Sequence, residues 1–439
     1  MPAPPYSASA GWTAPTASGP LSAVVQLPGS KSLTNRELVL SALADGPSTL
    51  RRPLAARDTD LMVEALRRLG TRIDRAADGT LTIEPAPLTG GVDIDCGLAG
   101  TLMRFLPPVA LLADGPVRFD GDARARARPM ATTVLSLRAL GAEVDDGGRG
   151  TLPFTVTARG MRGGLVAIDA SASSQFVSGL LLVGPRLHDG IMVEHRGERL
   201  PSMPHIAMTI DALERRHVRV ETVRIEPPAA LWRVGPQRIR GRDVEIEPDL
   251  SNAAPFLAAA LVAGGTVTVP GWPSRTTQVG DRLRSWLGAY GAGVQVERGA
   301  LTVNGGAGAL ARPLLPVDLD LSEGGELAPT LVGLAVFADG RSTFTGIGHL
   351  RGHETDRLAA LAAELTAVGA TVEETDDGLV VEPGRLVAPD RPWRAYEDHR
   401  MATTGALVGL GVDGLVVDDI ATTAKTLPEF AELWRRMLP

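Results

Sequence analysis

The feature that most constrains the fold is a segment plan that recurs along the chain: an amphipathic helix, a glycine break and an alternating strand hairpin. Its copies cover 61–83, 130–156, 208–225, 281–303 and 356–381, and a helix at 428–438 belongs to a sixth copy whose hairpin lies at the start of the chain or is missing. The copy at 208–225 is the weakest, because His217 stands where the others have glycine. The copies recur at intervals of roughly seventy to eighty residues, longer than a solenoid period. Each copy is therefore expected to be a supersecondary block of strand–helix pairs.

Between these amphipathic helices the sequence predicts a second series of helices that are apolar on nearly all sides. They are expected at 36–44, 102–112, 175–183, 253–262, 327–338 and 401–409. A helix without a polar face must be buried all round. The alternation of the two kinds predicts an α/β protein of two pseudo-threefold lobes, with helices packed inside and sheets outside. The alternative is a generic α/β enzyme with accidental internal similarity.

The composition bounds the domain count and excludes several classes of protein. A chain of 439 residues is too long for one ordinary core and predicts two large domains. Its net charge of −7 argues against a general nucleic-acid binder, so any basic cluster must be local. The single cysteine, Cys96, excludes an internal disulfide and a thiolate zinc site.

Targeting and membrane segments are not expected. Residues 1–20 are rich in Pro, Ala and Ser and lack the cationic start and apolar core of a secretory signal. The chain has no apolar run of about eighteen residues, so no membrane span is expected. We therefore expect a cytoplasmic protein.

The most informative local motif begins where an expected strand ends. Pro28 and Gly29 stop a short apolar strand, and a helix with Lys31, Ser32 and Arg36 in its first turns follows at once. The unpaired amides of a helix N-terminus favour an anion such as a phosphate or a carboxylate, and Ser32 and Arg36 share one helical face. The pattern is not a Walker motif, since no glycine stands five residues before a Gly-Lys pair. A capped helix with solvated charges is the alternative.

Two further segments of the first half suit a ligand. Residues 97–101 form a glycine turn in which the backbone at Gly100 can approach a ligand closely. Arg124, Arg126 and Arg128 alternate, so they are expected to project on one side of an extended segment. Close helix packing at the glycine and solvation of the arginines are the alternative explanations.

A third polar segment precedes an apolar helix. Ser173, Ser174 and Gln175 are expected to cap the helix that begins at Phe176. Serine is common at this position, and two serines and an amide together also suit a phosphate group.

The second half of the chain places charges of both signs at helix starts. Glu326 opens an apolar helix, and His353 and Arg357 are four apart at the start of the next. Arg400 opens a buried helix, and Lys425 precedes the last helix. Each of these residues alone is more often structural. As a set they suit substrates with several negative charges and a reaction that moves protons.

These motifs stand in a recognisable order and spacing. They are Pro28-Gly29-Ser30-Lys31-Ser32 with Asn35-Arg36, Ala99-Gly100-Thr101 with Arg104, Arg128-Pro129, Ser173-Ser174-Gln175, Glu354-Thr355-Asp356-Arg357-Leu358, Asp398-His399-Arg400-Met401 and Lys425-Thr426. Together they resemble the 3-phosphoshikimate 1-carboxyvinyltransferase (EPSP synthase) family over essentially the whole chain. The resemblance implies the enolpyruvyl transferase fold: α/β, with two inverted lobes, each a pseudo-threefold of βαβαββ units with buried helices and outer mixed sheets. One lobe is expected at 28–247 and the other, discontinuous, at 1–27 plus 248–439.

The resemblance also implies a reaction and its site residues. An enolpyruvyl group passes from phosphoenolpyruvate to the 5-hydroxyl of shikimate 3-phosphate, and phosphate is released. The positions that match the shikimate 3-phosphate site are Lys31, Ser32, Arg36, Ser173, Ser174, Gln175, Ser202, Glu326 and His353. Those that match the phosphoenolpyruvate site are Lys31, Gly100, Arg128, Gln175, Arg357, Arg400 and Lys425. The lobe at 28–247 would then carry Lys31, Arg128 and most of the shikimate 3-phosphate site, and the other lobe Glu326, Glu354 and the remaining cations.

Three of the matched positions are expected to be catalytic: Lys31, Glu326 and Glu354. Addition to an enol ether needs a proton on the methylene carbon while a hydroxyl attacks its neighbour, and elimination reverses that proton traffic. We hypothesise that Lys31 and Glu354 shuttle the proton and that Glu326 deprotonates the hydroxyl. One acid–base set used twice is sufficient, so neither a cofactor nor a metal ion is expected. The expected partners are the two small substrates, without nucleic acid or membrane, and the expected state is a monomer.

The chain departs from the commonest bacterial pattern near the shikimate ring. Leu98 replaces an Asn, His205 a Tyr, His349 an Asn, His353 a Lys and Glu326 an Asp. This pattern resembles that of actinobacterial members. None of the departures falls on the arginines that match the phosphoenolpyruvate site.

Two alternatives remain. The related enolpyruvyl transferase that acts on UDP-N-acetylglucosamine has a loop cysteine five residues before an Arg-Pro pair, where this chain has Ala123. A non-catalytic anion-binding protein would not need Glu326 and Glu354 beside the cations, because carboxylates weaken anion binding. The family resemblance also implies inhibition by glyphosate, for which Gly100 leaves room.

Overall fold

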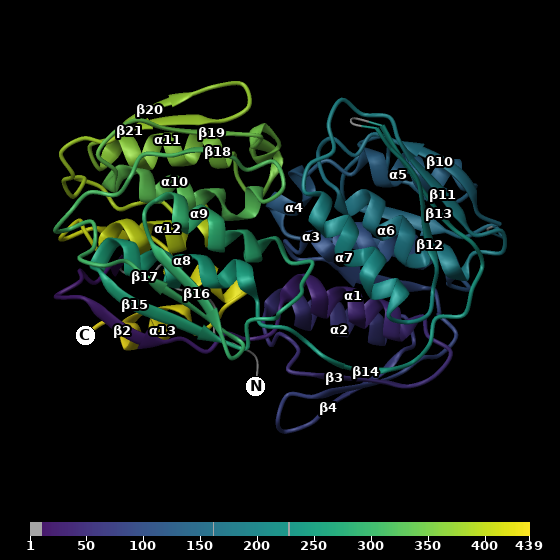
Figure 1. Cartoon of the computed structure of the whole chain (residues 1–439). Coiled ribbons are helices and arrows are strands. Elements are labelled where there is room, and N and C mark those ends of the chain that lie inside the picture. Colours follow the sequence, from purple (N-terminus) through teal and green to yellow (C-terminus); the bar gives the residue numbers. More distant parts are fainter. Residues whose placement is uncertain (1–10, 161, 227–228) are drawn as a thin grey trace. The chain divides into compact units, whose positions relative to one another are not determined.

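The computed structural model describes residues 11–160, 162–226 and 229–439. Residues 1–10, half of the segment expected not to be a secretory signal, lie outside this description. The chain forms two compact units (Figure 1). Pro28–Pro248 make the central unit, and Met1–Leu27 with Asp249–Pro439 make the terminal unit.

The central unit consists of three blocks, each with one four-stranded sheet. The first block has α1 (Lys31–Ala42), β3 (Ser48–Arg51), α2 (Arg57–Arg68), β4 (Arg72–Arg75), β5 (Leu81–Glu84) and, from the end of the unit, β14 (Asp243–Glu245). The second has β6 (Val92–Asp95), α3 (Gly100–Val109), β7 (Val117–Asp120), α4 (Ala123–Ala127), α5 (Ala131–Ala139), β8 (Glu143–Asp145) and β9 (Phe154–Thr157). The third has β10 (Gly164–Ile168), α6 (Gln175–Val183), β11 (Ile191–His195), α7 (Met203–Glu214), β12 (Val220–Glu226) and β13 (Ala229–Val234).

The three sheets share one topology. Their strand orders are β14-β3-β5-β4, β6-β7-β9-β8 and β10-β11-β13-β12. In each sheet the first two strands are parallel and the other pairs are antiparallel. Parallel neighbours need a crossover and a hairpin gives antiparallel ones, so this order follows from a strand–helix–strand–helix–hairpin plan. The repeat predicted from the sequence is confirmed.

The terminal unit repeats the plan twice in full and once in part. Its first block has β2 (Leu21–Val24), α8 (Leu250–Ala263), β15 (Gly265–Pro270), α9 (Leu283–Ala289), β16 (Gly293–Glu297) and β17 (Ala300–Asn304). Its second has β18 (Asp318–Asp320), α10 (Ala328–Leu334), β19 (Ser342–Thr345), α11 (Arg357–Ala367), β20 (Thr371–Glu374) and β21 (Leu379–Glu382). The partial block has α12 (His399–Gly409), β22 (Val416–Val417), α13 (Phe430–Met437) and β1 (Trp12–Thr13), which pairs with β22. The partner strand of the sixth copy thus comes from near the chain start.

Short 3₁₀ helices complete the elements: η1 (Ala110–Leu112), η2 (Gly184–Arg186), η3 (Val279–Arg282), η4 (Gly325–Leu327), η5 (Ala335–Phe337), η6 (Gly348–Gly352) and η7 (Ile420–Lys425). Several of them continue or precede a buried helix, as η1 continues α3 and η5 continues α10. The apolar segments expected as single helices at 102–112 and 327–338 are therefore each divided between an α-helix and 3₁₀ turns.

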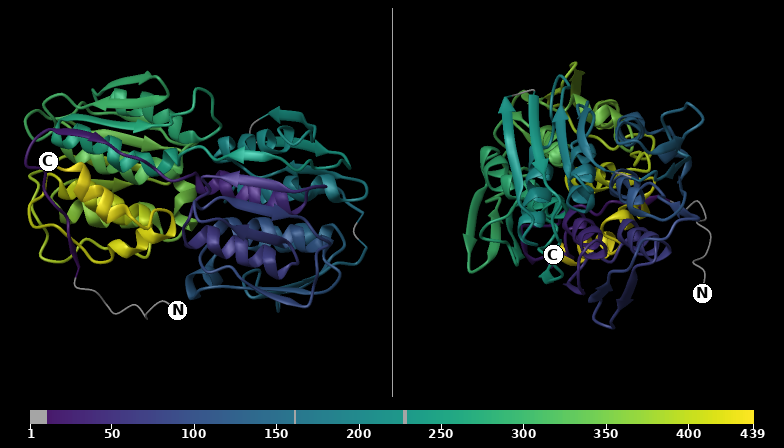
Figure 2. Two further views of the ribbon diagram at one scale, coloured as in Figure 1. Left: turned by 90° about the horizontal axis from the view of Figure 1, so that it is seen from below. Right: turned by 90° about the vertical axis from the view of Figure 1, so that its right-hand side faces the viewer.

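The helices are of the two kinds that the sequence predicts. Every residue of α8 and of α12 is buried, whereas α2 buries one side, which includes Met62 and Leu66. Helices α8, α10 and α12 pack together inside the terminal unit, between its sheets (Figure 1). The right-hand view of Figure 2 looks onto the strands at the surface of the central unit. Each unit has its own apolar core. Of the helices described, none is long and apolar enough to cross a membrane.

Candidate active site

The first turn of α1 presents Lys31 beside a buried carboxylate. Ser30 is the N-cap residue, and its hydroxyl oxygen faces the Leu33 amide at 3.5 Å. The Lys31 ammonium lies 3.6 Å from Oδ2 of Asp58, whose side chain is almost completely buried. Asp58 belongs to the first turn of α2. The sequence motifs did not single out Asp58, because its approach to Lys31 depends on how α2 packs against α1.

Arg36 holds the helix starts of the central unit together. Its Nη1 donates to the Ser32 carbonyl at 2.9 Å, its Nε to the Thr209 hydroxyl at 2.8 Å, and its Nη2 to the His205 carbonyl at 2.9 Å. The guanidinium is buried and lies over the Phe105 ring. The structure thus joins Arg36 to Ser32, but it encloses the guanidinium in protein acceptors.

Gly100, at the start of α3, lies among three long polar side chains. A methyl group added at Gly100 would stand 3.3 Å from Gln175 Oε1 and 3.4 Å from Nη1 of both Arg104 and Arg128. The Nε and Nη1 atoms of Arg128 are buried and have no hydrogen-bond partner in the described part of the chain. An unsatisfied buried guanidinium is costly, so this place is suited to an anionic ligand. Arg104, which appeared only within a family motif, is a neighbour that the expected site did not include.

The expectation of one extended arginine segment is wrong. Residues 123–127 form the short helix α4, which contains Arg124 and Arg126, and only Arg128 has an extended backbone. The Arg126 side chain donates from both Nε and Nη2 to the carboxylate of Asp120. The alternation of short and long side chains is typical of a strand. However, Asp122 occupies the N-cap position of α4 and the alanines favour a helix, so a helical turn forms instead.

The serine segments lie at the starts of α6 and α7. Helix α6 covers Gln175–Val183, the range expected for this apolar helix, and the capping oxygen is that of Ser173, which accepts from the Gln175 amide at 3.3 Å. Ser174 is buried at the N-cap position without a side-chain cap bond. Ser202 precedes α7 with a φ of 55°, a left-handed conformation that is unfavourable for a residue with a side chain. The bond between Asn35 and Thr101 joins α1 to α3, so the starts of the buried helices are linked across the unit.

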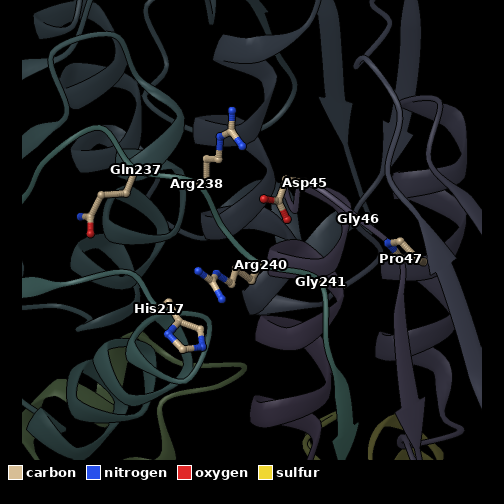
Figure 3. Close-up of a pocket in the computed structure, with 8 residues that line it drawn as sticks. All are labelled: Asp45, Gly46, Pro47, His217, Gln237, Arg238, Arg240 and Gly241. Carbon is tan, nitrogen blue, oxygen red and sulfur yellow. The ribbon is translucent and has the colours of Figure 1, made fainter.

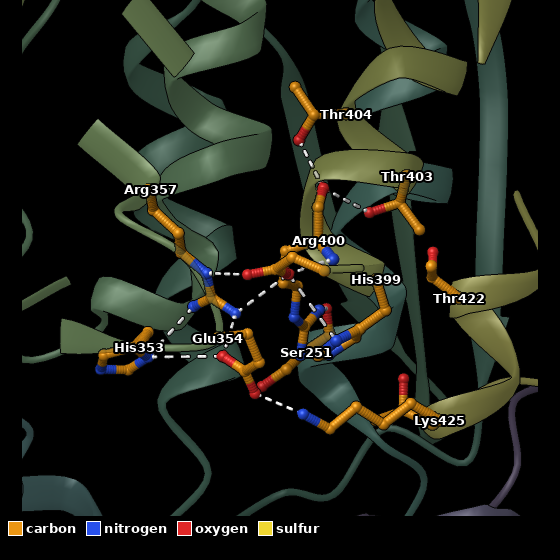
Figure 4. Close-up of polar contacts among 12 residues, drawn as sticks. Ser251, His353, Glu354, Arg357, His399, Arg400, Thr403, Thr404, Thr422 and Lys425 are labelled. Atoms are coloured by element: carbon orange, nitrogen blue, oxygen red, sulfur yellow. Dashed lines mark hydrogen bonds and ion pairs between the residues drawn. The ribbon is translucent and has the colours of Figure 1, made fainter. Parts of the chain in front are cut away.

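In the terminal unit the predicted charged residues form one cluster (Figure 4). Arg357 donates to both oxygens of Asp398, at 2.7 Å from Nε and 3.2 Å from Nη2. The same Nη2 lies 3.1 Å from Oε2 of Glu354, and Oε1 of Glu354 accepts from Lys425. Glu354 therefore sits between two cations from different elements, and all of these side chains are at least nine-tenths buried.

Arg400 and Glu326 are joined through Ser251. The Ser251 carbonyl accepts from Arg400 Nη1 at 2.7 Å, and the Ser251 hydroxyl donates to Glu326 Oε1 at 2.5 Å. Ser251 lies in the first turn of α8, where the N-cap Asp249 accepts from its amide. Neither Ser251 nor Asp398 was among the expected site residues. Ser251 could have been found from the sequence, because it is a polar residue in the first turn of a helix whose other residues are mostly apolar.

His353 lies just outside the helix that it was expected to open. Asp356 is the N-cap of α11, which begins at Arg357, so His353 precedes the helix. Its Nδ1 is nevertheless 3.3 Å from Arg357 Nη1, and its ring lies 5.7 Å, centroid to centroid, from that of His349. His349 Nε2 would contact a methyl group added at Gly325, the residue before Glu326. Both histidines therefore belong to the same cluster as Glu326.

The cluster is charged and its backbone is strained. Burial alone would lower the pKa of Arg357, but Asp398, Glu354 and Glu326 together raise it above its ordinary value, so Arg357 stays protonated. Tyr396 and Glu397, directly before Asp398, both have a φ of 56°. Left-handed residues with side chains often mark functional sites, where packing holds them in place. Across the described ranges, no three His, Cys, Asp or Glu side chains are grouped so as to hold a metal ion.

The fold is that of the enolpyruvyl transferases. The chain is similar to two solved structures of EPSP synthase from Acinetobacter baumannii, with TM-scores of 0.78 and 0.77 at 24% and 23% identity over 97% of this chain and 97% and 98% of theirs. It is also similar to the enolpyruvyl transferase NikO from Streptomyces tendae, with a TM-score of 0.72 at 19% identity over 96% of both chains.

The sequence comparisons give the family. Residues 15–434 match the family model of EPSP synthase (3-phosphoshikimate 1-carboxyvinyltransferase). A 3-phosphoshikimate 1-carboxyvinyltransferase of Kocuria rhizophila is 51% identical, over 97% of this chain and 96% of its own. The chain belongs to the EPSP synthase family. The resemblance and the fold class predicted from the sequence are confirmed.

Proposed function

We propose that the helix starts described above bind the two substrates of the family's reaction and supply its proton transfers. In that reaction the enolpyruvyl group of phosphoenolpyruvate is transferred to shikimate 3-phosphate, which gives 5-enolpyruvylshikimate 3-phosphate and phosphate in the shikimate pathway. The observation that carries the proposal is the position of Glu354 between Arg357 and Lys425. A site that only binds anions gains nothing from a carboxylate there, whereas a site that moves a proton needs one.

The phosphoenolpyruvate site is proposed from cations that lie at or near helix starts in both units. In the central unit these are Lys31 and Arg128, with Gln175 and the open backbone at Gly100. In the terminal unit they are Arg357, Arg400 and Lys425. Arg357 and Lys425 contact the carboxylates of Asp398 and Glu354, and Arg400 donates to the Ser251 carbonyl. A substrate with a phosphate and a carboxylate matches such planar guanidinium donors.

The shikimate 3-phosphate site is proposed from hydroxyl and amide groups at helix starts. Ser173, Ser174 and Gln175 begin α6, Ser202 precedes α7, and Ser32 lies in the first turn of α1. Amides at a helix N-terminus and nearby hydroxyls suit a phosphate monoester. Two further residues are proposed for this site: Arg36, which donates to the Ser32 carbonyl, and His353, whose ring lies beside that of His349.

The proposed chemistry is an addition followed by an elimination. Glu326 removes the proton of the 5-hydroxyl, whose oxygen forms a bond to the central carbon of phosphoenolpyruvate, while Lys31 and Glu354 deliver a proton to the methylene carbon. The intermediate then loses a methyl proton to the same pair, the carbon–oxygen bond to phosphate breaks, and the double bond returns. The cations stabilise the leaving phosphate. In the net reaction the proton that Glu326 takes from the 5-hydroxyl passes to the released phosphate or to solvent.

The test is release of inorganic phosphate with both substrates present. Lys31→Met is expected to abolish turnover, and Glu354→Gln is expected to bind both substrates yet turn over at least a hundredfold more slowly. UDP-N-acetylglucosamine in place of shikimate 3-phosphate should give no phosphate, in keeping with Ala123 at the loop-cysteine position. Near-normal rates for Lys31→Met or Glu354→Gln would remove that residue from the mechanism.

We also propose that the chain acts as a cytoplasmic monomer. Every proposed site residue comes from this one chain, so the reaction needs no second copy. Sedimentation at working concentration, with activity measured over the same range, tests the monomer. Activity that rises with association would contradict it.

A further inference from the structure

The central unit has a polar pocket whose lining includes none of the proposed site residues (Figure 3). It has a volume of about 600 Å³ and is lined by the segment after α1, the residue His217 after α7, and the segment 237–241 before β14. Helix α1 has 12 residues, so Lys31 at its start is about 18 Å from its end, where the pocket begins. The pocket therefore lies at the end of α1 opposite to Lys31.

The charge of the pocket is positive. Figure 3 shows the side chains of Arg238, Arg240 and His217 in a row, with the carboxylate of Asp45 to one side. Within the described residues, neither Arg238 nor Arg240 forms an ion pair or a side-chain hydrogen bond, and Asp45 is the only acidic residue of the lining. Two arginines therefore line one pocket on a chain whose net charge is −7. Such a local excess of positive charge attracts small anions.

The pocket is held open by bonds that do not use these cations. The Gln237 side chain bonds to the Arg219 backbone in both directions, at 2.8 Å and 3.0 Å. The carbonyl of Arg240 accepts from Nη1 of the buried Arg216, whose other nitrogens bond to Glu37 on α1. The segment that presents Arg238 and Arg240 is thus fixed to α1 through Arg216, while its own guanidinium groups remain available.

His217 departs from the repeat at this place. In four other copies the residue after the amphipathic helix is a glycine with positive φ: Gly70, Gly141, Gly291 and Gly369. His217 has the same left-handed backbone, with a φ of 62°. Glycine adopts this conformation without steric cost, whereas histidine does not. A strained residue with an imidazole ring in the pocket is consistent with use of that ring.

We infer that this pocket binds a small phosphorylated compound or inorganic phosphate, separately from the two substrates of the reaction. Planar guanidinium donors match the oxygens of a tetrahedral dianion, and the imidazole adds a further donor. The residues that line the pocket include no Phe, Tyr or Trp. Asp45 is placed to accept from a hydroxyl of the ligand, which favours a phosphate monoester of a small hydroxy compound.

The test follows the imidazole of His217 by NMR in the full chain, which has seven histidines. His217→Gly assigns its signal. Inorganic phosphate and glycerol 3-phosphate are titrated at constant ionic strength, with sodium chloride as the reference. Saturable shifts of the His217 signal with either phosphate compound, and none with chloride, are expected. An equal affinity for both probes indicates free phosphate as the ligand, and a tenfold preference for glycerol 3-phosphate indicates a monoester.

The double variant Arg238→Gln/Arg240→Gln is expected to raise the dissociation constant at least tenfold, with the KM values for both substrates unchanged. Arg233→Gln, on the exposed side of β13, is the matched control and should keep the original affinity. Because the two pocket arginines are exposed and unpaired, their replacement should leave the circular dichroism spectrum unchanged. An unshifted His217 signal, or an equal loss of affinity in Arg233→Gln, would overturn the inference.

Discussion

Replacing Ser251 by alanine separates two functions of one residue. The Ser251 hydroxyl donates to Glu326, while its backbone carbonyl accepts from Arg400. Ser251→Ala removes the first bond and keeps the second, because alanine has the same carbonyl. If Glu326 is the base that attacks the 5-hydroxyl proton, the variant should lower kcat and leave the KM for phosphoenolpyruvate unchanged.

The size of the effect follows from the bond that is lost. A hydrogen bond to a charged group contributes about 1.5–3 kcal/mol, which corresponds to a roughly tenfold to 150-fold fall in kcat if the whole contribution orients Glu326. Ser251→Thr keeps a hydroxyl and should recover part of the rate. The measurement is phosphate release at saturating concentrations of each substrate in turn.

A matched control removes a comparable bond in the same cluster. The Thr404 hydroxyl donates to the Arg400 carbonyl at 2.8 Å (Figure 4), and within the described part of the chain it forms no bond to Glu326. Thr404→Val should cost about 1 kcal/mol of stability and leave kcat within threefold of the original. If Ser251→Ala has no larger effect on kcat than this control, then Ser251 does not orient the base.

Three other outcomes are expected. Gly100→Ala places a methyl group 3.3–3.4 Å from Gln175 and Arg128. The KM for phosphoenolpyruvate should therefore rise roughly tenfold, while the KM for shikimate 3-phosphate stays constant. A KM for phosphoenolpyruvate equal to that of the original chain would contradict the proposed site. The Gly150 amide and other donors lower the pKa of Asp146 to about 2, below the value of 3.8 for the free group. The resulting stability, at most about 2.5 kcal/mol, is present above pH 4 and lost as the pH falls through 2, so the free energy of unfolding in urea should differ between Asp146→Asn and the original chain much more at pH 7 than at pH 2. Burial raises the pKa of the Cys96 thiol, so a thiol reagent should modify the chain only after urea unfolds it.

Some parts of the site were predictable because they depend on local sequence. Pro28 and Gly29 end a segment, and the apolar run that follows can only be a buried helix, so Lys31 had to lie at a helix start. The same reasoning placed Arg400 at the start of α12, where Asp398 is the N-cap residue. Caps and apolar patterns act over a few residues, and this is why they can be read without the fold.

Other parts could not be predicted because neighbouring residues left two conformations open. The alternation at Arg124, Arg126 and Arg128 fits a strand, yet α4 forms there and leaves only Arg128 beside Gly100. A five-residue helix gains too few internal bonds to be read from its own sequence, and packing decides whether it forms.

The sequence by itself determined the block plan, the two kinds of helix and the helix starts that carry charge, because periodicity and capping are local properties. Only the tertiary structure decided which charges meet. Glu354 bonds to Lys425, 71 positions away, and Ser251 bonds to Glu326, 75 positions away. Such pairs depend on how α8, η4, η7 and the segment before α11 pack together. Packing distributes its free energy over many apolar contacts, and no single sequence motif contains them.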